Sequence, residues 1–202
     1  MDLQIGDFEF SSIINSNYKI HIVGDVGSGK STLIKDFIGF AADYKYFCYI
    51  ITNKVHYDAF YSFYDTLYKY KRYSYLIEER LFADGIYLVL DDYNDIERYI
   101  NRIYNKVKDK KMAIITASTT DLKNAYSDYI IITTLTDSSE IYNLYEKYIK
   151  KFMSLEQFEL VIKMTTEDYE CLVINCNTDN IDDLFLSVLP EKRDDLKFNI
   201  RH

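Results

Sequence analysis

The sequence has little that would support a secreted, disulfide-bonded or membrane-spanning protein. Its three cysteines (Cys48, Cys171 and Cys176) are odd in number and form no C-x-x-C pair. That count argues against a disulfide framework or a zinc site and fits a reducing compartment. No apolar run is long enough to cross a bilayer. Residues 1–7 are acidic and lack the basic start and apolar stretch of a signal peptide. We therefore expect a protein without stable membrane insertion that is not secreted.

Positive charge is also scarce, with 24 Lys and Arg against 32 Asp and Glu and a net charge of −8. A protein that coats nucleic acid is usually basic, so any contact with DNA has to use a local patch. The candidates are residues 69–73 and 106–111, although such runs are also typical of solvated faces. The three histidines (His21, His56 and His202) are scattered and receive no chemical role.

The most informative motif is at residues 24–31, which match G-x-x-x-x-G-K-[ST], the phosphate-binding P-loop. A predicted strand (18–23) precedes it, and a predicted helix (32–42) follows it. The glycines let backbone N–H groups point at a phosphate chain, and the start of the helix adds its positive dipole end. Lys30 is expected to reach the β- and γ-phosphates of ATP, and the Ser31 hydroxyl is expected to bind Mg²⁺. The expected ATP-binding residues are Gly24, Asp25, Val26, Gly27, Ser28, Gly29, Lys30, Ser31 and Thr32.

A second motif follows 60 residues later, where the apolar run 86–90 ends in Asp91 and Asp92. This is the form of a Walker B strand, which delivers its last residues to the carboxyl edge of a sheet. There Asp91 is expected to hold Mg²⁺ opposite Ser31, and Asp92 to orient or deprotonate the attacking water. The next predicted strand, 112–118, ends in hydroxyl residues, and Thr116 and Ser118 are candidate sensors of the γ-phosphate.

Strands and helices alternate along the chain, which predicts an α/β fold with a mainly parallel sheet and helices on both faces. The extra strand 112–117 indicates a P-loop NTPase of the RecA/ASCE type, in which a strand is inserted between the Walker A and Walker B strands. We expect a single domain over residues 1–202, with a core of about 17–176 and a short C-terminal extension. Further predicted strands are 8–10, 46–52, 129–133 and 170–175; predicted helices are 56–68, 76–82, 96–107, 138–150 and 154–164.

This layout resembles the viral DNA-packaging ATPases of poxviruses and other large DNA viruses, within the FtsK–HerA superfamily. The resemblance covers roughly residues 17–176. It is carried by the P-loop at 24–31, the run 46–51 followed by Thr52-Asn53, the triplet Leu90-Asp91-Asp92, the strand 112–118, and the helix 152–163 before the strand 171–175. Two features depart from the family: its sensor strand commonly ends in glutamine where Ser118 stands, and it tends to carry an arginine where this chain has Lys106 and Lys108.

The resemblance implies a homo-oligomeric ring that hydrolyses ATP with Mg²⁺, stimulated by DNA, and pushes double-stranded DNA into a viral capsid. Such a motor grips the DNA backbone without reading its sequence. Its implied partners are ATP, double-stranded DNA, and a capsid or membrane protein at the packaging vertex. The implied location is the host cell cytoplasm, in the virus factory, or the virion. These motors complete each site with a cation from the neighbouring subunit, and Arg98 and Arg102, four apart on one predicted helix, are the candidate trans arginines.

Other classes share the P-loop. A nucleoside or nucleotide kinase needs an arginine-rich lid, whereas Arg72 and Arg80 are isolated. A nucleotide-binding switch protein can do without a catalytic carboxylate, yet Asp92 is present. An AAA+ loader needs a C-terminal helical domain, and too little chain follows residue 176. Turnover of ATP without a phosphate acceptor, stimulated by DNA, separates the motor from the kinase.

Overall fold

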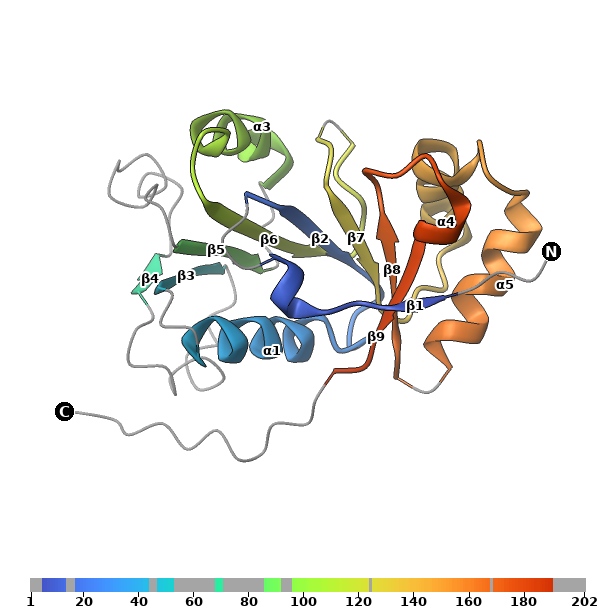
Figure 1. Ribbon diagram of the computed structural model, residues 1–202, viewed down its shortest axis with the longest axis horizontal. Coiled ribbons are helices and arrows are strands. Elements are labelled where there is room, and N and C mark those ends of the chain that lie inside the picture. Colours follow the sequence, from blue (N-terminus) through green and yellow to red (C-terminus); the bar gives the residue numbers. More distant parts are fainter. Residues whose placement is uncertain are drawn as a thin grey trace.

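The protein, described here from a computed structural model, is built on a nine-stranded sheet in the order β1-β9-β8-β7-β2-β6-β5-β3-β4 (Figure 1). The structure describes residues 5–13, 17–43, 47–52, 68–70, 86–91, 96–123, 125–167 and 169–190. The strands are β1 (Gly6–Asp7), β2 (Lys19–Val23), β3 (Phe47–Thr52), β4 (Tyr68–Tyr70), β5 (Ile86–Asp91), β6 (Met112–Ser118), β7 (Tyr129–Ile132), β8 (Cys171–Asn175) and β9 (Phe185–Val188). The helices are η1 (Phe10–Ile13), α1 (Lys30–Asp43), α3 (Ile96–Val107), α4 (Ser138–Leu144), η5 (Tyr145–Ile149), α5 (Leu155–Thr166) and η6 (Ile181–Asp183).

The centre of the sheet is parallel, and strand β6 lies between β2 and β5 as the sequence predicts. Residues Ile20, Ile22, Leu88 and Leu90 in these strands are completely buried. Strands that are apolar on both faces need a helix layer on each side, and this explains their near-continuous hydrophobic runs. Because all three strands point the same way, the P-loop, the end of β5 and the end of β6 meet at one edge of the sheet.

Helices cover both faces, which confirms the predicted architecture. In Figure 1, α1 lies below the sheet and α3 lies above it, with α4 and α5 at the end of the sheet that contains β8 and β9. On the α1 side, Phe37 packs in one apolar core with residues of β2, β6 and β7. On the other side, Phe158 of α5 stacks on Phe185 of β9, with ring centroids 6.3 Å apart.

The sheet continues beyond the predicted last strand, and its edge is mixed. Strand β8 runs antiparallel to β7, β9 runs antiparallel to β8, and β1 pairs in parallel with β9. The prediction of a mainly parallel sheet is confirmed, but β9 was not predicted. The predicted strand at 8–10 is wrong: the strand is Gly6–Asp7, and a 3-10 helix begins at Phe10.

Most predicted helices agree in position, with one change of type. The predicted helix 138–150 is an α-helix only as far as Leu144 and continues as a π-helix over Tyr145–Ile149. Helix α5 begins after Ser154, which forms a capping box with Gln157. The predicted helix 76–82 lies outside the described residues, as does 56–68 except for Tyr68, which is the first residue of β4.

Helix α1 depends on Phe37 for its packing, so the first test concerns stability. Phe37 is 1% exposed, and its ring meets Phe10 edge-on with centroids 4.5 Å apart. We expect Phe37→Ala to lower the free energy of unfolding by about 3–5 kcal/mol, because the large cavity that it leaves cannot collapse fully. Urea unfolding followed by circular dichroism measures the change. The exposed Tyr142 offers a control: Tyr142→Ala should change stability by less than about 1 kcal/mol. Equal losses in the two variants would contradict the assigned core.

Candidate nucleotide site

The P-loop runs from Gly24 to the first turn of α1 and has the backbone that its glycines predict. Gly27 has φ +82° and Gly29 has φ +92°, in the left-handed region that side chains disfavour. Gly24 is required for a different reason: a Cβ at this position would lie 2.0 Å from Oγ1 of Thr133. The loop therefore curls tightly against the end of β7, and its N–H groups are placed to meet an anion at the start of α1.

Lys30 lies within this curl. Its side chain is 7% exposed, and its Nζ donates to the carbonyls of Gly24 and Asp25, both at 2.7 Å. An ammonium group held by backbone dipoles in a nearly dry loop is a strong point charge for phosphate oxygens. The structure thus places the predicted cation inside the loop and not in solvent.

Ser31 and Asp91 meet, as the metal-binding prediction requires. The Ser31 hydroxyl donates to Oδ2 of Asp91 at 3.1 Å, although the two residues lie 60 positions apart. Asp91 is completely buried at the end of β5, in register with Ala117 of β6. A hydroxyl and a carboxylate oxygen are hard ligands that suit Mg²⁺, which takes its remaining ligands from phosphates and water. The donor set therefore fits Mg²⁺ with ATP, and among the described residues no group of three or more His, Cys, Asp or Glu offers a different metal site.

Residues directly after β7 make a set of contacts with the P-loop that the sequence analysis missed. Ser28 Oγ donates to Thr133 Oγ1 at 2.6 Å, since the Thr133 hydroxyl itself donates to the Val23 carbonyl. Oδ2 of Asp25 accepts from the N–H (3.0 Å) and the hydroxyl (2.7 Å) of Thr136. We call residues 133–136 the β7 clamp. The available signal was a pair of threonines, Thr133 and Thr134, at the end of the predicted strand 129–133, the same rule that drew attention to the end of β6.

The candidate sensors at the end of β6 lie on a different face from the P-loop lysine. Thr116 is fully buried; its Oγ1 lies 2.7 Å from Nδ1 of His21 and donates to the Ile20 carbonyl at 3.2 Å. These partners favour a structural role for Thr116 in joining β6 to β2. Ser118 hydrogen-bonds the Thr120 carbonyl and lies 3.4 Å from Nε2 of His21, nearer to the nucleotide edge. The sensor assignment therefore stays a prediction for Ser118, and the geometry speaks against it for Thr116.

His21, to which the sequence analysis gave no role, is completely buried in β2. Its Nε2 lies 2.9 Å from the Thr120 carbonyl, which can only accept, so Nε2 carries a proton. Its Nδ1 faces the Thr116 hydroxyl oxygen at 2.7 Å. The imidazole thus ties the segment after β6 to the strand that enters the P-loop.

The other predicted residues lie at the P-loop, on α3 or outside the described residues. Val26 and Thr32 are exposed at the P-loop, with Val26 at 89%. Asp92, the predicted catalytic carboxylate, lies outside the described residues. Arg98 and Arg102 both lie on α3, and Arg102 is exposed.

The cysteines behave as the sequence indicates. Burial raises the pKa of the Cys48 thiol to about 12 and that of the Cys171 thiol to about 12, so both are inert hydrophobic side chains at neutral pH. Within the described part of the chain, no helix combines the length and apolar character needed to cross a membrane.

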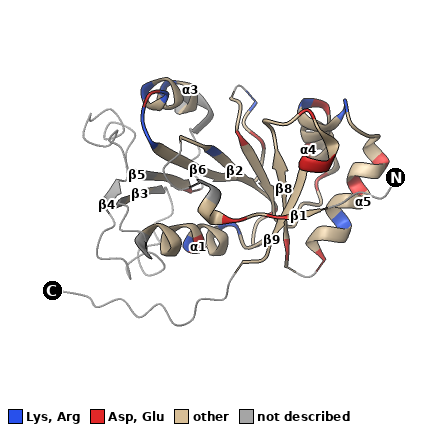
Figure 2. Cartoon of the chain, viewed as in Figure 1, with Lys and Arg blue, Asp and Glu red and all other residues tan. Residues whose placement is uncertain are grey.

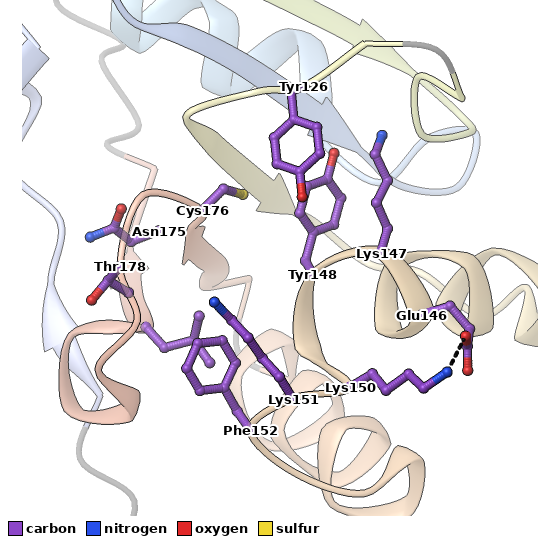
Figure 3. Close-up of a pocket in the computed structure, with 11 residues that line it drawn as sticks. Tyr126, Glu146, Lys147, Tyr148, Lys150, Lys151, Phe152, Asn175, Cys176 and Thr178 are labelled. Atoms are coloured by element: carbon purple, nitrogen blue, oxygen red, sulfur yellow. Dashed lines mark hydrogen bonds and ion pairs between the residues drawn. The ribbon is translucent and has the colours of Figure 1, made fainter.

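A cavity of about 510 Å³ lies at the opposite edge of the sheet, between η5 and the end of β8 (Figure 3). Three lysines reach this region, but each is neutralised: Lys147 by Asp121 at 2.7 Å, Lys150 by Glu146 at 2.9 Å, and Lys151 by Asp179. Tyr148 and Lys147 lie beside Tyr126, and the ammonium of Lys147 is 5.7 Å from the Tyr126 ring centroid. Each of the three ammonium groups thus already has a carboxylate partner.

Comparisons with known proteins bear on the fold. No protein-family model matches the sequence, and no curated protein matches it significantly. Among solved structures, the chain resembles the genome packaging NTPase B204 of Sulfolobus turreted icosahedral virus 2, in a complex with sulfate: TM-score 0.62, 17% identity, 87% of this chain and 98% of that chain covered. B204 of Sulfolobus turreted icosahedral virus, described as a DNA-packaging ATPase, gives TM-score 0.60 and 17% identity over 88% of this chain and 99% of that one.

A third likeness is to ATPases 2 and 3 of EssC from Geobacillus thermodenitrificans, with TM-score 0.50 and 13% identity over 92% of this chain and 42% of that chain. At these identities the likeness shows a shared fold. The predicted resemblance to viral packaging ATPases is thus confirmed in the fold of nearly the whole chain.

The β7 clamp generates a test that is specific to the nucleotide site. We expect Thr133→Val to raise the KM for ATP about fivefold, because the isosteric change removes the hydroxyl that Ser28 and Val23 share, a loss of about 1 kcal/mol. Thr133→Ser, which keeps the hydroxyl, should restore most of the affinity. The exposed neighbour Thr134 supplies a matched control, since Thr134→Val keeps the backbone carbonyl that accepts from Asp25 at 2.8 Å. An unchanged KM in Thr133→Val would show that the clamp does not position the loop.

Proposed function

We propose that this protein is an ATP-hydrolysing motor that moves double-stranded DNA into a viral capsid. The observation that supports it most directly is the contact between Ser31 and Asp91, which joins the P-loop to the end of β5 across an inserted strand. The near full-length likeness to two viral packaging NTPases supports the choice of DNA packaging among the functions open to this fold.

In the proposed reaction, the N–H groups of residues 24–29 surround the β-phosphate of ATP, and Lys30 contacts the β- and γ-phosphates. Ser31 and Asp91 would hold Mg²⁺, which would supply positive charge next to the phosphoryl group. Asp92, directly after Asp91, orients the attacking water and accepts its proton. The β7 clamp keeps the loop rigid, so that these groups need no reorganisation during the reaction.

The motor needs an assembly to act on DNA. We propose a homo-oligomeric ring in which Arg98 or Arg102 of one subunit reaches the ATP of its neighbour. Helix α3 suits this role because it begins five residues after Asp91, close to the nucleotide edge. The proposal includes Ser118 as the γ-phosphate sensor and a capsid or membrane protein at the packaging vertex as the docking partner. It places the protein in the host cell cytoplasm or the virion.

The first test is turnover. We expect release of phosphate from ATP without any phosphate acceptor and a rise in the rate on adding double-stranded DNA. Lys30→Ala should lower the rate by about 10²–10³, because it removes charge stabilisation of the transition state. A coupled phosphate-release assay measures both effects, and Lys35→Ala on the same helix is the control. Turnover of Lys30→Ala within threefold of the parent would contradict the P-loop assignment, and turnover only with a nucleoside acceptor would indicate a kinase.

The second test concerns the shared site. An arginine supplied in trans contributes about 10³–10⁵ in rate. We expect Arg98→Ala or Arg102→Ala, and separately Asp92→Asn, to be inactive alone, and a mixture of the two subunits to recover activity because some interfaces then hold both groups. Asn105→Ala, exposed on the same helix, should remain active and so serves as the control. Full activity in a strict monomer, or no recovery with either arginine variant, would remove the shared site.

A further inference from the structure

The described part of this acidic chain contains a short basic segment. Residues 96–111 contain six Lys or Arg and two acidic residues, a local net charge of +4 in a chain whose total is −8. Four of these cations follow one another at the end of α3 and in the connection to β6. We call Lys106, Lys108, Lys110 and Lys111 the lysine turn. Figure 2 shows this blue stretch on α3 and the connection below it.

The lysine turn is exposed on a fixed backbone. Helix α3 buries Ile100, Ile103, Tyr104 and Val107, so the opposite side of its last turn faces solvent. All four lysines are exposed, and only Asp109 lies among them as an acid. The N–H of Lys110 donates to the Val107 carbonyl at 2.9 Å, and Asn17 donates to the Lys108 carbonyl at 3.2 Å. The ammonium groups are therefore displayed from a turn that is tied to the N-terminal end of β2.

Helix α3 connects the lysine turn to the side of the sheet that carries the nucleotide site. The turn lies at the edge of the sheet where β6 begins, opposite the edge that carries the P-loop. Helix α3 spans the distance between the two edges with 12 residues, a length of about 18 Å.

We propose that the lysine turn binds the phosphate backbone of double-stranded DNA. The inference rests on the proposed function and names the surface by which the motor holds its DNA. Lysine is a compact point charge without the planar fork that reads base edges, so a cluster of lysines suits contact with phosphates at any sequence.

The test uses the full chain and a labelled 30-base-pair DNA duplex, with the dissociation constant measured by fluorescence anisotropy at several salt concentrations. Each phosphate contact contributes about 0.9 to the slope of log K against log salt. The variant Lys106→Gln, Lys108→Gln, Lys110→Gln, Lys111→Gln should lose about 3–4 units of slope and at least tenfold in affinity at low salt. The loss should be the same for two unrelated DNA sequences.

A matched control separates a local surface from total charge. Lys123→Gln, Lys150→Gln, Lys151→Gln, Lys163→Gln removes the same number of exposed lysines elsewhere and should keep the slope within one unit. Thermal melting and nucleotide affinity without DNA establish that both variants are folded.

Each outcome has one meaning. Loss of slope only in the lysine-turn variant supports the proposal, and equal slopes in both variants and the parent overturn it. If the turn instead served an anionic membrane, the parent would bind vesicles of phosphatidylserine through these lysines while the variant kept its affinity for DNA, which also overturns the proposal. A parent protein that binds no duplex DNA at 50 mM salt would contradict the proposed function itself.

Discussion

The contact between Ser31 and Asp91 requires two strands that are not neighbours to present their ends to the same point. Strand β6 separates β2 from β5, so the ends of the outer two lie about 10 Å apart across the sheet. Helix α1 closes this distance, because it leaves β2 and crosses the face of the sheet over β6 and β5. Ala113, Ile115 and Ala117 of β6 are buried in the same core as α1. The position of the two proposed metal ligands therefore depends on the packing of α1 over β6 and β5.

The shape of the P-loop depends on its own glycines and on the β7 clamp. Only the first of these can be predicted from the sequence. Residues 24–31 follow a short-range pattern, and the backbone they adopt follows from the glycines alone. The β7 clamp joins residues 105 to 111 positions apart, and no local pattern contains that pairing. The threonines after β7 could be seen, but their partners depend on β7 lying beside β2. That adjacency is a property of the sheet order, which a single sequence does not specify.

Two other features, the direction of the edge strand β8 and the face of β6 on which Thr116 lies, also could not be predicted from local sequence patterns. Hydrophobic runs predict that 171–175 is a strand, but they do not predict its direction, and β8 runs antiparallel to β7. The prediction of Thr116 as a sensor relied on its place near the end of a strand. Side chains alternate between faces along a strand, and the register places Thr116 opposite His21. A hydroxyl beside a buried imidazole finds its hydrogen bond there, and this is why the buried His21 and Thr116 form a pair.

The acidic remainder of the chain has a consequence for how a polyanion approaches it. Apart from residues 96–111 the net charge is −12, so most of the surface repels DNA. Repulsion between DNA phosphates and acidic side chains disfavours other binding orientations, just as attraction to basic side chains favours one. Acidic composition and the proposed DNA binding are therefore compatible: the negative remainder would disfavour other orientations, and the lysine turn would present positive charge to a duplex. Because that turn lies at the far end of α3 from Asp91, the phosphates of ATP and the phosphates of DNA would occupy opposite edges of one sheet.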